Sequence, residues 1–122
     1  MRPMKGRSIL LLWLLAINPA VAAVDFMNDV KPLLSRLGCN GSACHGKAEG
    51  QNGFKLSVFG ADPEGDYHSI LKEARGRRIT QTAPEVSLFL LKATGEIGHG
   101  GGVRLQKGSR EYRVLHDWIR GG

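Results

Sequence analysis

The sequence has little of several features that define common classes of protein. It contains only two cysteines and three methionines in 122 residues, and its longest apolar run, ILLLWLLAI, spans nine residues. Two cysteines exclude a multiply disulfide-bonded scaffold and a four-cysteine zinc site. Nine apolar residues are too few for a membrane-spanning helix, which needs about 20. The sequence also shows no repeat and no low-complexity segment, which argues for a single ordinary domain.

The first 23 residues have the pattern of a secretory signal peptide. The basic stretch MRPMKGR precedes the apolar run, and NPAVAA supplies the small residues of a cleavage site. This order predicts export to the periplasm, with cleavage near Ala22 or Ala23 and no stable membrane span afterwards. Residues 24–122 are then the folded domain.

Charge gives little support for a nucleic-acid partner. The formal net charge is +6, but three of the 17 basic residues precede residue 24 and all 11 acidic residues follow it. The net charge of residues 24–122 is therefore only +3. A basic footprint for nucleic acid needs a stronger and more clustered excess, so we expect no nucleic-acid binding.

Four helices are predicted, which makes the fold class all-α. They cover residues 26–37, 63–75, 84–93 and 110–120, and long glycine-rich loops connect them. Asp29 is the expected N-cap of the first, because Pro32 is tolerated only in a first turn. Asp62 with Pro63, and Ser109, are the expected starts of the second and fourth. The third is expected to bury a stripe of Val86, Phe89, Leu90 and Ala93.

The stretch CNGSACHG contains both cysteines, Cys39 and Cys44, followed by His45. Three interpretations use this pair. In an oxidising compartment it could form a disulfide, although so small a loop gains only about 2 kcal/mol and leaves His45 unexplained. Zinc would need His99 and His116 to complete a tetrahedral site. In the third, the thiols attach one haem c covalently and His45 is the proximal iron ligand.

The haem interpretation accounts for all three residues, and it also suits a domain with few large apolar side chains to fill its core. The usual spelling of the motif is C-x-x-C-H, whereas here it is C-x4-C-H. We expect the two additional residues to bulge outward from the small segment 40–43, leaving the sulfurs in place.

The sixth ligand of such an iron is less obvious, because Met27 is the only methionine after the predicted signal. His99 lies in GEIGHGGGV between the third and fourth helices, where glycines allow the backbone to approach a porphyrin closely. It is therefore the expected distal ligand. His68 is the main rival, His116 is expected to be solvated, and an open sixth position remains an alternative.

Two further groups have competing interpretations. Arg77 and Arg78 follow the second helix, and they are either part of a solvated charged segment or a source of a salt bridge to a haem propionate. Tyr67, Phe89 and Trp118 are expected to pack in the core, with no redox role.

Three stretches together resemble the planctomycete-type cytochrome c domains of the class I cytochrome c superfamily. They are FMNDVKPLLSRLGCNGSACHGKAEGQNGFKLSVFG, PEVSLFLLKATGEIGHGGG and EYRVLHDWIRGG, and the resemblance extends over residues 25–121. The C-x4-C-H spelling and the lack of a methionine in the ligand loop depart from the family pattern. The resemblance implies an all-helical fold with the first and last helices packed beside the haem. It also implies one-electron transfer to a redox partner protein rather than enzymatic catalysis.

Two alternative functions remain. An open sixth position would instead suggest a ligand-binding or catalytic haem module, and a disulfide would suggest a non-haem binding module.

Overall fold

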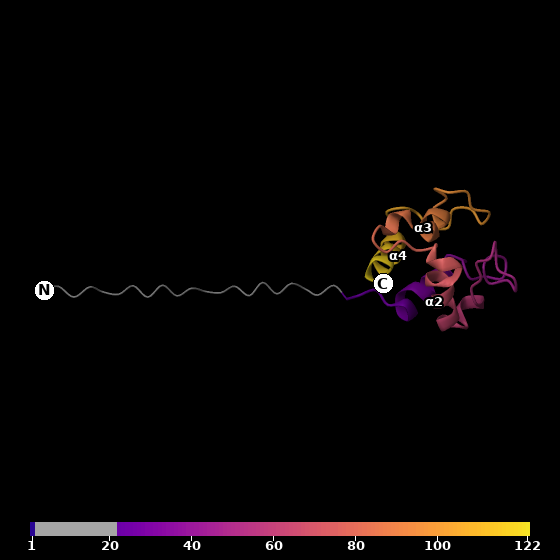
Figure 1. Ribbon diagram of the computed structural model, residues 1–122, viewed down its shortest axis with the longest axis horizontal. Helices are drawn as coiled ribbons and strands as arrows, with labels where there is room; N and C mark the ends of the chain where they lie inside the picture. Colours follow the sequence, from indigo (N-terminus) through magenta and orange to yellow (C-terminus); the bar gives the residue numbers. More distant parts are fainter. Residues whose placement is uncertain (2–21) are drawn as a thin grey trace.

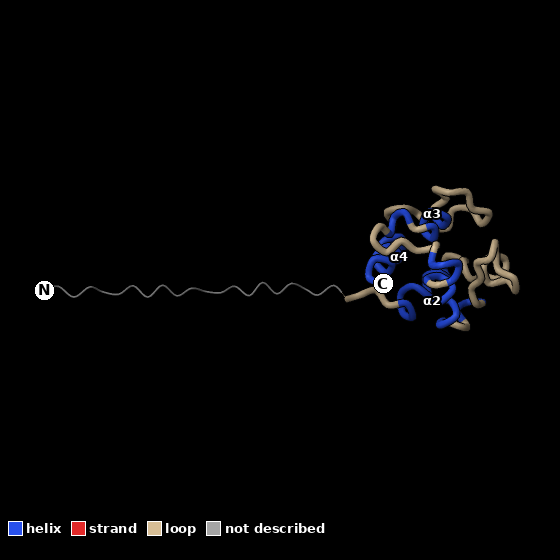
Figure 2. Tube along the Cα trace, viewed as in Figure 1, coloured by secondary structure: helices blue, strands red, loops and turns tan. Residues whose placement is uncertain are grey.

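The computed structural model describes residue 1 and residues 22–122. The predicted signal peptide falls almost entirely outside the described residues and stays a prediction. Within residues 22–122 the chain forms a small, mostly helical domain with four α-helices and no strands (Figures 1 and 2). The α-helices are α1 (Lys31–Arg36), α2 (Pro63–Leu71), α3 (Leu88–Ala93) and α4 (Arg110–Gly121). Four short helical turns accompany them: η1 (Phe26–Val30), η2 (Val58–Gly60), η3 (Glu73–Gly76) and η4 (Pro84–Val86).

The first helical segment begins earlier than predicted. Asp25, not Asp29, caps it, because the Asp25 carboxylate accepts a hydrogen bond from the Asn28 amide at 2.7 Å. The Asp29 carboxylate instead accepts from the Asp25 amide at 2.8 Å, so both carboxylates accept from backbone amides at the start of this segment. The wider turn η1 carries the chain to Pro32, which lies at the start of α1, where its missing amide hydrogen costs little.

The second helix starts as predicted and ends early. Asp62 accepts from the Gly65 amide at 3.0 Å, and Pro63 is the first helical residue. The helix ends at Leu71 rather than at residue 75, because Ala74 and Arg75 have φ values of 52° and 60°. This left-handed backbone is unfavourable for any residue with a Cβ, and it reverses the chain direction before residue 77.

The third predicted helix is split in two by Ser87. Its backbone is extended (ψ 129°), and its buried hydroxyl accepts from the Thr80 amide at 2.8 Å. Val86 therefore lies before the break and is 54% exposed, so its assignment to the buried stripe is wrong. Leu90 is fully buried, whereas Phe89 and Ala93 are partly buried beside the core.

The last helix closes the domain against its first segment. Ser109 caps α4 by accepting from the Tyr112 amide at 3.1 Å, as predicted. The helix α4 contacts η1, η4 and α3, and Figure 1 shows it beside the N-terminal segment. Phe26 joins the two segments, because its ring lies 5.4 Å from Trp118 and 5.3 Å from Tyr67. The buried core comprises Val30, Leu33, Leu34, Leu56, Ile70, Leu90, Leu105, Tyr112, Leu115, Trp118 and Ile119.

Two long loops leave this helical scaffold on the side away from the N-terminal segment, and Figure 2 draws both in tan. One includes residues 38–57 and the other residues 94–109. Among residues 22–122, no helix combines the length and the apolar character needed to cross a bilayer.

Replacing Ala74 by glycine should stabilise the domain. Its φ of 52° costs an L-residue roughly 1–2 kcal/mol, part of which is offset by the larger entropy of glycine in the unfolded chain. We expect Ala74→Gly to raise the free energy of unfolding by about 0.5–1 kcal/mol in urea titrations. Ala61→Gly is the matched control, since Ala61 is exposed with an ordinary φ of −64°, and it should lower stability. Equal losses in both variants would contradict the strain at position 74.

Candidate functional site

A cavity of about 660 Å³ lies where the two long loops meet α3. Cys39, Cys44, His45 and His99, the four residues predicted to bind haem, all line it. Its apolar wall is formed by Leu34, Leu37, Phe54, Leu88, Phe89, Ala93 and Leu115. Basic side chains also line it, namely Arg77, Arg78, Lys92 and Arg104. The volume is typical of a site for a small molecule or cofactor.

The segment between the cysteines folds as a compact turn. Gly41 O accepts hydrogen bonds from the amides of Cys44 (3.0 Å) and Gly46 (3.0 Å), and the His45 amide donates to Cys39 O at 3.0 Å. A Cβ at Gly46 would overlap the backbone oxygen of Asn40, so glycine is required there.

The segment does not bulge outward as a whole, which corrects the prediction for residues 40–43. Asn40 is 1% exposed and donates to the Ser35 hydroxyl at 2.9 Å, whereas Ser42 and Ala43 are exposed. Asn40 thus attaches the turn to α1, whereas Ser42 and Ala43 face solvent.

Both cysteines are free thiols at the cavity wall. Burial, reinforced by the neighbouring Cys44, raises the pKa of Cys39 to about 11, so Cys39 is a protonated thiol at neutral pH. The guanidinium of Arg104 approaches the Cys44 sulfur at 4.0 Å. Both thiols therefore lie at the cavity wall with no disulfide between them.

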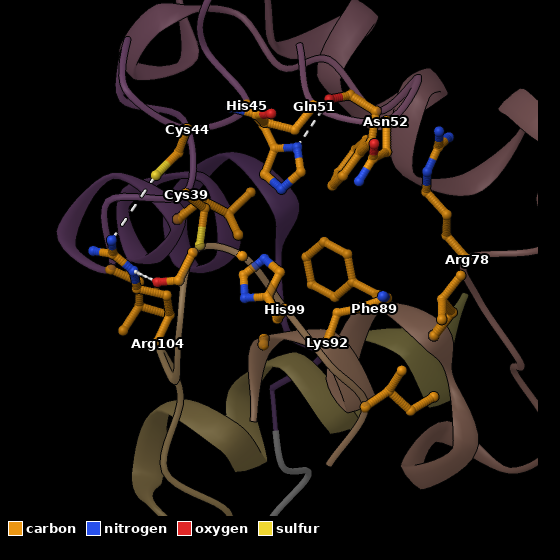
Figure 3. A pocket seen from close by; sticks show the side chains of 18 of the residues that line it. Cys39, Cys44, His45, Gln51, Asn52, Arg78, Phe89, Lys92, His99 and Arg104 are labelled. Atoms are coloured by element: carbon orange, nitrogen blue, oxygen red, sulfur yellow. Dashed lines mark hydrogen bonds between the residues drawn. The ribbon is translucent and has the colours of Figure 1, made fainter. Parts of the chain in front are cut away.

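His45 is held in one orientation by the loop that follows it. Its Nδ1 lies 2.8 Å from Phe54 O, and because a carbonyl can only accept, Nδ1 must donate. The neutral ring then carries its lone pair on Nε2, which points into the cavity in Figure 3. Burial lowers the pKa of His45, which favours this neutral form at pH 7. A neutral imidazole with a fixed tautomer is the form that ligates a metal.

His99 is held in the same way by its own loop. Its Nδ1 donates to Gly102 O at 2.7 Å, and the Gly102 amide donates back to His99 O at 2.9 Å. Two cations fix the surrounding backbone: Lys92 donates to Gly98 O at 2.7 Å, and Arg104 donates to Gly101 O at 2.8 Å. The unprotonated nitrogen of the neutral ring is again Nε2.

The two imidazoles face each other across the cavity. Their ring centroids are 6.3 Å apart and their planes differ by 10°. Figure 3 shows them on opposite walls, with Phe89 beside the gap between them. Metal–imidazole bonds of about 2.0 Å would put the two ligating nitrogens about 4 Å apart and the ring centroids, each about 1 Å behind its nitrogen, about 6 Å apart. The observed centroid separation of 6.3 Å is therefore compatible with one ion between the two rings.

The rival ligands lie elsewhere. Met27 is 46% exposed on η1 and His68 is exposed on α2, and neither lines the cavity. His116 is not solvated as expected: its side chain is 18% exposed and lies 3.6 Å from the carboxylate of Glu85. Among residues 22–122, no three His, Cys, Asp or Glu side chains gather as a metal site, so the alternative zinc ligands are not brought together.

Arg78 is not part of a solvated charged segment, whereas a salt bridge to a propionate stays a prediction. Arg78 is 5% exposed, and its guanidinium donates to Ser69 O at 2.7 Å and Gly53 O at 2.9 Å. It also lies 4.5 Å from the centre of the Phe54 ring. Arg77, in contrast, is exposed at the cavity, and its side chain makes no hydrogen bond or ion pair within the described residues. Sequence reasoning overlooked Phe54, Lys92 and Arg104, because their contacts with the site depend on loop geometry.

No family model, no curated protein and no solved structure matches the chain. A functional assignment therefore depends on the residues of the cavity themselves.

Proposed function

We propose that this chain is an exported mono-haem c-type cytochrome domain that transfers single electrons. In this proposal Cys39 and Cys44 would bind the haem covalently, His45 would be the proximal iron ligand and His99 the distal one. The finer fold proposed is that of a class I cytochrome c-like domain. Its partner would be a redox protein in the periplasm.

The observation that carries the proposal is the geometry of the two imidazoles. Their parallel rings are 6.3 Å apart across a cavity that both thiols line. Each ring also donates its Nδ1 hydrogen to a backbone carbonyl, which leaves Nε2 of each neutral ring as the nitrogen that would bind a metal. Structural and catalytic zinc sites need three or four protein ligands, and the described residues offer no such cluster.

Haem would supply one-electron exchange at its iron, and the residues of the chain would hold it and tune it. Each thiol would add across one vinyl group, so that its hydrogen moves to carbon and no atom is lost. Two imidazole ligands give a lower potential than a methionine–histidine pair. A filled sixth position also leaves no place for an external ligand, which favours electron transfer over catalysis.

The cavity wall suits such a group in two further respects. Phe54, Phe89 and Leu115 provide apolar contacts for a porphyrin face, and they exclude water from it. Arg77 is the basic residue available to pair with a propionate, because Lys92, Arg104 and Arg78 already donate to backbone carbonyls.

The protein expressed with a haem-attachment system should carry one covalent haem. We expect an intact mass equal to that of the processed chain plus one haem, and a pyridine spectrum of haem c with one haem per chain. Cys39→Ser/Cys44→Ser should carry no covalent haem, and each single variant should retain one thioether. A wild-type mass corresponding to the bare dithiol or to a disulfide would contradict the proposed function and favour a non-haem module.

Replacing His99 should open the sixth position. We expect His99→Ala to change the iron from low spin to high spin, and its ferrous form to bind carbon monoxide, which the wild type should not bind. Absorption and electron paramagnetic resonance spectra measure this change.

His68→Ala is the matched control, because His68 is exposed and lies outside the cavity, and it should leave the spectrum unchanged. The opposite pattern, with loss of the low-spin signal in His68→Ala alone, would overturn the assignment of His99. Binding of carbon monoxide by the wild type would favour a haem module with an open sixth position.

A further inference from the structure

Arg78 is buried in a position where its charge is shared among backbone acceptors and an aromatic ring. It bridges α2, through Ser69 O, and the loop after His45, through Gly53 O. Its only carboxylate partner within the described residues is Glu73, at 3.6 Å, which is itself 44% exposed. A buried guanidinium is costly unless its donors are satisfied, and here the two carbonyls, the Phe54 ring and the Glu73 carboxylate compensate for that cost.

Phe54 connects Arg78 to the proximal histidine in two ways. Its ring lies 4.5 Å from the Arg78 guanidinium on one side and 4.4 Å, centre to centre, from the His45 ring. Its carbonyl accepts from His45 Nδ1 at 2.8 Å and from the Gln51 amide at 3.0 Å. Arg78 thus contacts both the carbonyl of the preceding residue and the ring of Phe54, the residue whose carbonyl accepts from His45.

The backbone that leads to Arg78 is strained. Ala74, Arg75 and Gly76 have consecutive positive φ values of 52°, 60° and 68°. Two of these three residues carry a Cβ, and such strain persists only where the surrounding contacts compensate for it. The reversal brings Arg78 back beneath α2, where its bonds to Ser69 O and Gly53 O supply that compensation.

We propose that Arg78 is a positioning residue that acts through Phe54 on His45. By holding the Phe54 carbonyl against Nδ1, it sets how strongly the proximal imidazole donates to iron. This inference rests on the proposed function, because it assumes that His45 is an iron ligand.

The hydrogen bond to Nδ1 makes the imidazole more basic, which stabilises ferric over ferrous iron. Loosening the Phe54 carbonyl therefore favours the reduced form. Arg78→Lys tests this without removing the charge. Lysine keeps one positive charge, but it lacks the planar guanidinium that donates to two carbonyls and packs on the Phe54 ring at the same time. If only the charge of Arg78 matters, Arg78→Lys should have the same ratio of oxidised to reduced protein as the wild type. If the position of the guanidinium matters, the ratio should change.

The experiment uses the haem-loaded protein and four forms: wild type, Arg78→Lys, Phe54→Leu and the double variant. Phe54→Leu keeps the backbone carbonyl and an apolar side chain but removes the ring beneath Arg78. Potentiometric titration gives the ratio of oxidised to reduced protein at a fixed potential. Proton NMR of the ferrous form gives the exchange rate of the His45 Nδ1 hydrogen.

We expect Arg78→Lys to lower the oxidised-to-reduced ratio by about threefold or more and to speed Nδ1 exchange by about tenfold. Phe54→Leu should shift both quantities in the same direction, and the double variant should shift them by less than the sum of the single changes. Arg75→Lys is the matched control, because Arg75 is exposed two residues after Glu73 and does not line the cavity, and it should change neither quantity.

Unchanged ratio and exchange in a folded, haem-loaded Arg78→Lys would overturn the inference while leaving the proposed function intact. Strictly additive shifts in the double variant would also overturn it, because they would show that Arg78 does not act through Phe54. If Arg78→Lys does not acquire haem, the test rests on Phe54→Leu. A wild-type ratio and a wild-type exchange rate in that variant would then reject the inference. Failure of the wild type to acquire haem is a different result, which rejects the proposed function.

Discussion

The hydrogen bond from His45 Nδ1 to the Phe54 carbonyl is the contact on which the geometry of the site depends. It closes the segment from His45 to Phe54 onto the cysteine segment, and the Leu56 amide reinforces the closure by donating to His45 O at 2.9 Å. The bond also selects the tautomer that exposes Nε2 to the cavity. Without it, both the ring orientation and the position of Phe54 in the wall would be free to change. Arg78, buried behind the ring, holds the acceptor side of the same contact.

The residues of the core and the candidate ligands lie on different parts of the domain. Its fully buried apolar side chains lie mainly on α1, α4 and the segments packed against them, whereas the candidate ligands lie on two loops. A rigid helical scaffold that presents functional residues on loops is a common solution, because loops can bring backbone carbonyls and glycines close to a ligand. Here backbone carbonyls have two separate roles. Those of Phe54 and Gly102 orient the two imidazoles, and neighbouring ones accept from the cations that hold the loops in place.

Features set by neighbouring residues could be predicted from the sequence, and features set by distant contacts could not. The caps at Asp62 and Ser109 follow from one polar side chain before an apolar pattern, and the structure has both. The gathering of the two cysteines, His45 and His99 around one cavity also agrees with the pattern, although their binding of haem stays a prediction. The break at Ser87, the burial of Asn40 and the inward turn of Arg78 depend on partners such as Thr80, Ser35 and Gly53. Periodicity cannot report such partners, because the contacts exist only once the chain has folded.

The loop around His99 has a consequence for how such a site can change in evolution. Lys92 and Arg104 fasten this loop through the backbone oxygens of Gly98 and Gly101, and the Gly102 amide closes it on the backbone oxygen of residue 99. None of these three bonds uses the imidazole. The path of the loop is thus set mainly by its glycines and by two cations that flank residues 98–102, and the imidazole adds one further bond, from Nδ1 to Gly102 O. A substitution at position 99 removes only the imidazole bond and leaves the other three, so evolution can change the ligand offered to the cavity while most of the contacts that hold the loop persist.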